Sequence, residues 1–66
     1  MTRQEFSGTL LWRFLCVESA GWLRWEWQVW TQTGRLVATS RQSFETLTEC
    51  EADATAAGYI SPEKRL

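Results

Sequence analysis

Trp22-Leu-Arg-Trp-Glu-Trp-Gln-Val-Trp30 holds four of the five tryptophans of this 66-residue chain, and it is the stretch that decides the fold. In an extended strand, successive side chains lie on opposite faces. One face of this segment would carry Leu23, Trp25, Trp27 and Val29. The other face would carry Trp22, Arg24, Glu26, Gln28 and Trp30. The first set predicts a hydrophobic core, and the second predicts a mixed surface with an indole at each end.

Two further strands flank the tryptophan segment. Thr9 to Glu18 alternates in the same way and would place Leu10, Trp12, Phe14 and Cys16 on the core face. Ser19-Ala-Gly21 predicts the turn between these two strands. Gln32-Thr-Gly34 predicts the next turn, because glycine adopts the left-handed conformation that a short hairpin loop requires. A third strand is expected from Arg35 to about Gln42.

The hydrophobic period changes from Ser43 onward to intervals of three and four, which is typical of an α-helix. The apolar side of this helix would carry Phe44, Leu47, Cys50, Ala54 and Ala57. Ser43 or Thr46 can cap its first turn, and Thr46 with Glu49 has the spacing of a capping box. Gly58 is placed to end the helix, with Tyr59 folding back over Ala54.

These elements predict an α+β fold: a three-stranded antiparallel β-meander with one C-terminal α-helix packed on one face (β-β-β-α). We expect a single small domain over residues 1–66, with an ordered core at about 9–59 and flexible tails at 1–7 and 61–66. The predicted core is formed by Trp12, Trp25, Trp27, Leu47 and Cys50.

One helix can cover only one face of such a sheet, so the opposite face needs an explanation. An indole on a solvated face indicates a contact surface, and a two-fold axis supplies a complementary patch from the same sequence. We therefore predict a homodimer that forms through the aromatic sheet face or a strand edge, with another protein as a further partner. The predicted partner-binding residues are Trp22, Arg24, Trp30, Leu11, Leu15 and Arg13.

Tryptophan and arginine on an open sheet are also how several modules stack single-stranded bases. A single-stranded nucleic-acid-binding module that uses Trp22, Arg24 and Trp30 is therefore the alternative. The net charge of -1 and the pI of about 5.3 argue against it, as does Glu26 within the patch. Because Trp and Arg are also enriched at protein interfaces, the pattern favours a protein partner.

The chain contains no histidine, which removes histidine bases, histidine metal ligands and histidine-assisted nucleophiles. Cys50 is flanked by Glu49 and Glu51, and neighbouring negative charge opposes formation of a thiolate. We predict a buried structural thiol there, and a reduced rather than bridged pair with Cys16. No catalytic residue, metal site, cofactor or small-molecule substrate is predicted, so the chain is expected to be a non-enzymatic interaction or structural module.

The apolar runs are too short to cross a bilayer, and no secretory leader is evident at the N-terminus. We expect a cytoplasmic protein with no membrane partner. Charge is divided along the chain: residues 1–42 carry five arginines against three glutamates, and residues 43–59 carry four acids and no cation. The predicted sheet is thus mildly basic and the predicted helix acidic.

Gly34-Arg-Leu-Val-Ala-Thr-Ser40, followed by Phe44 and a helix, resembles the YegP-like family of small bacterial proteins. The resemblance covers about residues 10 to 58. It implies a β-β-β-α unit that commonly occurs as a tandem repeat, so that a chain with one unit would pair with a second copy. The family has no established activity, and the resemblance implies no catalytic residue.

Overall fold

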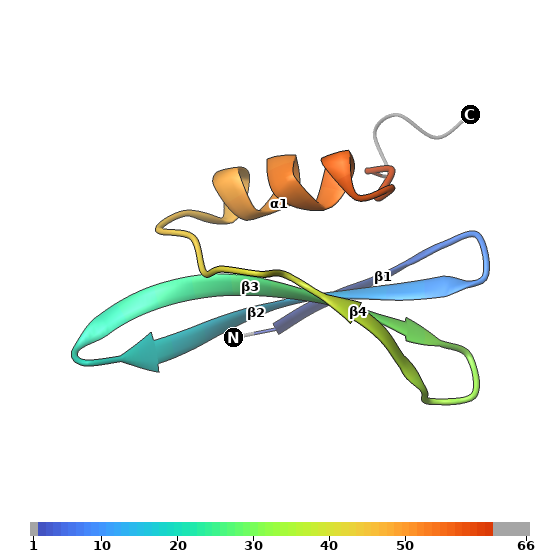
Figure 1. Cartoon of the computed structure of the whole chain (residues 1–66), viewed down its shortest axis with the longest axis horizontal. Coiled ribbons are helices and arrows are strands. Elements are labelled where there is room, and N and C mark those ends of the chain that lie inside the picture. Colours follow the sequence, from blue (N-terminus) through green and yellow to red (C-terminus); the bar gives the residue numbers. More distant parts are fainter. Residues whose placement is uncertain (1, 62–66) are drawn as a thin grey trace.

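The computed structural model describes residues 2–61 and shows an antiparallel sheet with one C-terminal helix on one side of it (Figure 1). The sheet order is β1-β2-β3-β4, so each strand pairs with its neighbour in sequence. The elements are β1 (Thr2–Ser7), β2 (Leu10–Ser19), β3 (Trp22–Thr31), β4 (Leu36–Thr39) and α1 (Leu47–Ala56). The α+β class and the antiparallel meander are confirmed, but the sheet has four strands rather than three.

The additional strand is β1, in the segment that we expected to be a flexible tail. Its pattern is difficult to recognise because two of the side chains that face the helix side, Arg3 and Glu5, are charged. Both are half-buried, since Arg3 forms an ion pair with Glu51 of α1 and Glu5 accepts a hydrogen bond from the Tyr59 hydroxyl. Residues 62–66 of the expected C-terminal tail lie outside the described residues.

The core lies between the helix and the facing side of β2 and β3. Trp12 and Trp27 are 3% and 6% exposed, and their ring centroids are 5.4 Å apart. Cys50 of α1 is fully buried, while Trp25 and Leu47 are partly buried and pack against this cluster. The predicted core is therefore confirmed, and it is extended by Phe14, Val29, Ala54 and Tyr59.

Leu23 is an exception to the predicted alternation. It shares the core side of β3 by register, yet it is 65% exposed. β2 and β3 are ten residues each, and they run beyond the helix at the end where their turn lies (Figure 1). Leu23 lies next to this turn, so no helical side chain covers it.

The helix begins later than its hydrophobic period suggests. Phe44 lies outside it and instead forms an isolated antiparallel bridge with Trp25, with N–H···O distances of 2.7 and 2.8 Å in the two directions. Thr46 is the N-cap, and its hydroxyl accepts from the Glu49 amide at 3.1 Å. Gly58 follows the last turn with φ of 117°, and the Tyr59 amide donates to the Ala54 carbonyl at 3.0 Å. The predicted cap and helix end are thus confirmed.

β4 is shorter than the predicted strand from Arg35 to Gln42. Val29 pairs with Ala38 but Trp30 pairs with Leu36, so Val37 is an extra residue that forms a β-bulge. β4 therefore has four residues with a bulge among them, and bulges bend a strand and disrupt its ladder locally.

Candidate interaction surfaces

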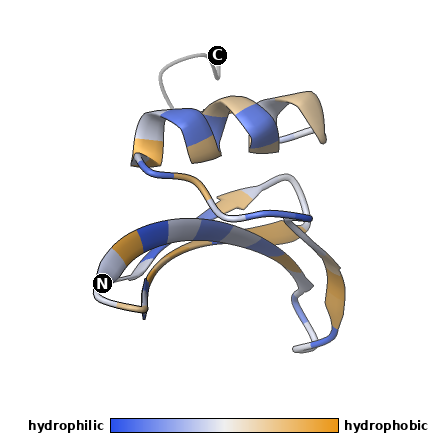
Figure 2. Cartoon of the chain, turned by 60° about the vertical axis from the view of Figure 1, so that its left-hand side comes forward, coloured by the Kyte–Doolittle hydropathy of each residue, from blue (hydrophilic) through white to orange (hydrophobic). Residues whose placement is uncertain are grey.

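The face of the sheet opposite α1 is not covered by any element among residues 2–61 (Figure 2). Cross-strand pairing brings four apolar side chains into one line across all four strands of this face. They are Phe6 of β1, Leu11 of β2, Trp30 of β3 and Leu36 of β4, here called the apolar row. Phe6 is 52% exposed and Leu36 is 47% exposed, and these two form the ends of the row on the edge strands.

A polar row runs beside the apolar row and partly shields its centre. It consists of Gln4, Arg13, Gln28 and Thr39. The Trp30 indole N–H donates to the Gln28 side-chain oxygen at 3.1 Å, and the Arg13 guanidinium lies 5.8 Å from the centre of the Trp30 ring. Arginine over an indole is a cation–π arrangement, so Trp30 is half-buried even without a partner.

By strand register, the predicted partner-binding residues belong to this face, but they are not equally accessible. Leu11, Leu15, Arg13, Arg24 and Trp30 are all partly buried, whereas Trp22 is 73% exposed. Trp22 and Trp30 are eight residues apart on β3, which corresponds to about 26 Å along an extended strand. They therefore belong to two separate patches rather than to one.

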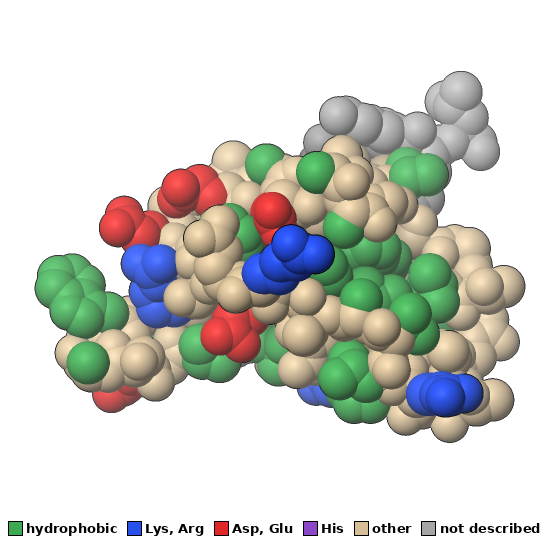
Figure 3. Space-filling model, viewed as in Figure 1, with side chains coloured by type: hydrophobic (Ala, Val, Ile, Leu, Met, Phe, Trp, Pro, Cys, Tyr) green, Lys and Arg blue, Asp and Glu red, His purple; other side chains and the backbone are tan. Residues whose placement is uncertain are grey.

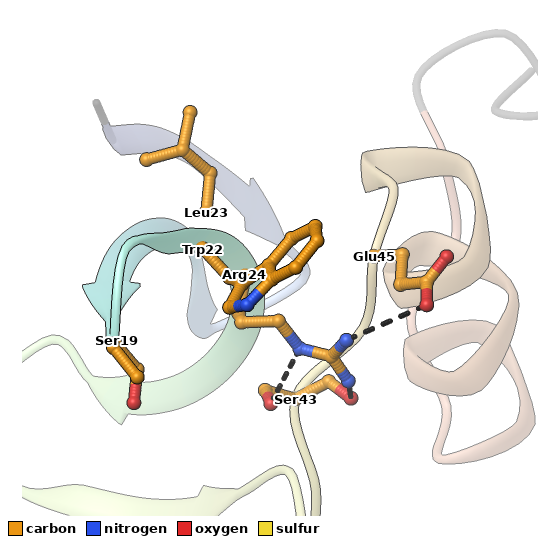
Figure 4. A pocket seen from close by; sticks show the side chains of 7 residues that line it. Ser19, Trp22, Leu23, Arg24, Ser43 and Glu45 are labelled. Atoms are coloured by element: carbon orange, nitrogen blue, oxygen red, sulfur yellow. Dashed lines mark hydrogen bonds and ion pairs between the residues drawn. The ribbon is translucent and has the colours of Figure 1, made fainter.

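The second patch is the tip of the β2–β3 hairpin, formed by Trp22 and Leu23. Hydrophobic atoms project there at the left-hand end of the space-filling view, where the turn lies (Figure 3). The tip borders an open depression of about 680 Å³ that is lined by Ser19, Ala20, Trp22, Leu23, Arg24, Ser43 and Glu45 (Figure 4).

Arg24 lies in this depression but its guanidinium is already engaged. It donates to the hydroxyl of Ser43 at 3.1 Å and to the Ser43 carbonyl at 2.9 Å, and it lies 3.8 Å from the Glu45 carboxylate (Figure 4). These contacts tie β3 to the segment that precedes the helix. A phosphate at Arg24 would therefore have to compete with three existing contacts.

Sequence reasoning missed Phe6 and Leu36 as surface residues. Phe6 fell in the segment that was expected to be a tail, and the alternation of the third predicted strand was interrupted by the bulge at Val37. The only indication of β1 in the sequence was Ser7-Gly-Thr9, in which Gly8 adopts φ of 66° between two paired strands.

Of the two cysteines, Cys50 is fully buried and is not placed for nucleophilic chemistry. Both are free, and burial of the Cys50 thiol, together with the charges of Asp53 and Glu51, raises its pKa to about 11. The thiol is therefore protonated at neutral pH, as the sequence predicts for a structural cysteine.

Within residues 2–61, no three acidic or cysteine side chains gather in a way that could hold a metal ion. The one helix of the described chain is too short and too polar to cross a membrane.

Comparisons with known protein families, with curated proteins and with solved structures found no match to this chain. The resemblance to the YegP-like family therefore remains a prediction.

Proposed function

We propose that this chain is a non-enzymatic protein–protein interaction module that forms a homodimer through the uncovered face of its sheet. The observation that carries this proposal is the apolar row, which crosses all four strands on the side that lacks a helix. Antiparallel sheets tolerate water on one face when that face is polar, but a continuous apolar line favours a partner.

A second copy suits the row for two reasons. The four side chains of the row are uncharged, and the charge beside them, the Arg13 guanidinium, lies against the Trp30 ring of its own chain, so two rows can meet across a two-fold axis through apolar groups. A chain of about 60 residues buries only about 60% of its unfolded surface, so pairing of sheets also adds the apolar burial that a small domain lacks. The resemblance to a family in which a β-β-β-α unit commonly occurs as a tandem repeat would also imply pairing of two copies, here with β1 as an additional strand.

The test is the molecular mass in solution as a function of concentration. Wild-type chain is expected to sediment at twice its mass of 7.7 kDa. Phe6→Ser together with Leu36→Ser should give a folded monomer, because both side chains are about half exposed at the ends of the row and contribute little to the core. Val37→Ser is the matched control, since Val37 is 55% exposed but is not part of the row; it should remain dimeric.

Three outcomes would contradict the proposal. A wild-type monomer at hundreds of micromolar removes the dimer altogether. Loss of the dimer in Trp22→Ser with Leu23→Ser, but not in the row variant, transfers the interface to the hairpin tip. Tight, salt-sensitive binding of a labelled single-stranded oligonucleotide would favour the nucleic-acid alternative, because phosphate contacts weaken steeply with salt.

A further inference from the structure

The outer edge of β4 is a free sheet edge among the described residues, because the strand order ends there. The Ser40 amide donates to the Trp27 carbonyl at 2.9 Å, so the backbone of residue 40 faces β3. In an antiparallel ladder, adjacent residues direct their backbone groups to opposite sides. The N–H and C=O groups of Thr39 therefore face the open edge, where an added strand could pair with them.

Two unpaired arginines flank this edge. Of the five arginines in residues 2–61, three are engaged by acids, by a serine or by aromatic rings: Arg3, Arg13 and Arg24. The side chains of Arg35 and Arg41 are exposed and have no ion pair or hydrogen bond in the described structure. They stand just before and just after β4, six residues apart, which is about 20 Å along an extended chain.

A groove lies on the helix side of the same edge. It has a volume of about 620 Å³ and is lined by Trp27, Ala38, Thr39, Arg41, Gln42, Asp53, Ala56 and Ala57. The Trp27 indole N–H donates to Asp53 at 2.8 Å, so Asp53 is already paired. The alanines leave room for one row of side chains from an added strand, and Arg41 is the unpaired charge in the groove.

We propose that β4 binds an extended, acidic segment of another protein, which adds to the sheet as a fifth strand. Peptide addition to a free edge takes its affinity from main-chain hydrogen bonds and its specificity from the side chains around the edge. Here Arg35 and Arg41 would select carboxylates toward the two ends of the added segment, and Val37 offers an apolar contact between them. The homodimer proposed above uses the sheet face, so this inference does not rest on it.

Charge argues against the two other occupants. If two copies of β4 paired antiparallel about Ala38, Arg35 of each copy would lie opposite Arg41 of the other, and like charges directly opposite destabilise a pair of strands. Residues 62–66 of this chain include Lys64 and Arg65 against one acid, so that segment also has the wrong sign.

The first experiment compares two labelled seven-residue peptides by fluorescence anisotropy. Both have Thr and Val alternating in the centre, and one ends in Glu and the other in Lys at each terminus. The acidic peptide should bind about tenfold more tightly. Its two glutamates form exposed ion pairs with Arg35 and Arg41, whereas the lysines of the other peptide are repelled by the same arginines. A proline at the centre of the acidic peptide should abolish binding, because it cannot complete the ladder.

Matched variants locate the site. Arg35→Ala with Arg41→Ala should reduce the affinity for the acidic peptide about tenfold, whereas Lys64→Ala with Arg65→Ala, which makes the same change in net charge, should have little effect. Thr39→Pro removes an amide that faces the edge and spares the ladder to β3, so it should abolish binding, whereas Thr39→Val should bind normally. In the wild type, the Thr39 amide should become protected from hydrogen exchange when the acidic peptide is added.

Equal affinity for the two peptides, or binding that survives both Thr39→Pro and the double arginine variant, would overturn the proposal. A concentration-dependent doubling of mass that Thr39→Pro abolishes, and that Phe6→Ser with Leu36→Ser leaves intact, would assign the edge to a second copy instead. A wild-type chain that stays monomeric and still binds the acidic peptide would remove the dimer and leave the peptide site intact, so the two proposals can fail separately.

Discussion

At the scale of single residues, the turn between β2 and β3 contains a strained alanine. Ser19 pairs with Trp22, so the turn has two central residues, Ala20 and Gly21, with φ of 51° and 83°. Two positive φ values in a two-residue hairpin indicate a type I′ turn, which favours asparagine or glycine at its first central position. An alanine in the left-handed region costs about 1–2 kcal/mol. The strain lies beside the exposed Trp22, on the hairpin tip.

Ala20→Asn should therefore stabilise the chain. We expect the free energy of unfolding to rise by about 0.5–1 kcal/mol, because asparagine tolerates the left-handed conformation at lower cost. In a domain of this size, 1 kcal/mol corresponds to a shift of about 4–8 °C in Tm. Ala20→Val is the control and should lower Tm, since a β-branched residue resists positive φ more strongly. Equal Tm values for the three chains would show that the turn is unstrained.

Tyr59 is the residue that joins the helix end to the first strand. It is 1% exposed, its ring lies 5.1 Å from that of Phe14 and 5.4 Å from that of Trp12, and its hydroxyl donates to Glu5. Burial, followed by the hydrogen bond to and the charge of Glu5, raises the pKa of this phenol to about 12. The folded state therefore favours the neutral phenol more than the unfolded state does.

Alkaline pH should unfold the chain in a predictable window. A raised pKa contributes stability that is complete below the unfolded value of about 10 and is lost as pH rises toward about 12. Tyr59→Phe should remove the part of the Tm decrease that falls between pH 10 and 12. The Cys50 thiol behaves in the same way, because its pKa is raised from the ordinary value of 9 to about 11. Cys50→Ala should therefore remove the part of the Tm decrease that begins at lower pH. A wild-type Tm that is constant from pH 8 to 11.5 would contradict both assignments.

At the scale of elements, the helix is held on the sheet by polar anchors as well as by its narrow apolar side. Of its ten residues, Cys50 and Ala54 are buried. Two side-chain bonds supplement them: Asp53 accepts from the Trp27 indole at 2.8 Å, and Glu51 pairs with Arg3 of β1. The position of the helix over β3 thus depends on acids that face inward, while its N-terminus is fixed by the Thr46 cap.

Asp53→Ala should destabilise the fold by about 1–3 kcal/mol, because it leaves the N–H of an indole that is 6% exposed without its acceptor. Asp53→Asn retains an acceptor oxygen for the indole N–H, so this variant should lose less stability than Asp53→Ala. Chemical denaturation of both variants measures the difference, with Thr48→Ala on the exposed side of the helix as the control. If Asp53→Ala and Thr48→Ala unfold at the same denaturant concentration, the indole bond contributes nothing to docking.

At the scale of the whole molecule, the elements that could be predicted from the sequence are those determined by residues close to one another in the chain. β2 and β3 follow from alternation, the helix end follows from Gly58, and the N-cap follows from Thr46 and Glu49. β1 was missed because charged residues are not expected on the inner face of a strand. Arg3 and Glu5 can lie there because they contact Glu51 and Tyr59, which are more than 45 residues away in the sequence. The bulge at Val37 likewise depends on pairing with β3, so the apolar row and the free edge could be recognised only in three dimensions.

The unequal exposure of the tryptophans gives the chain two intrinsic optical reporters. Trp22 is exposed to water at the hairpin tip, whereas Trp12 and Trp27 pack against each other inside the core. An aqueous quencher such as iodide should therefore quench the fluorescence of Trp22 in the folded chain. It should quench the fluorescence of Trp12 and Trp27 only after denaturation. Binding of a partner at the hairpin tip and unfolding of the core can thus be followed separately in one unlabelled sample.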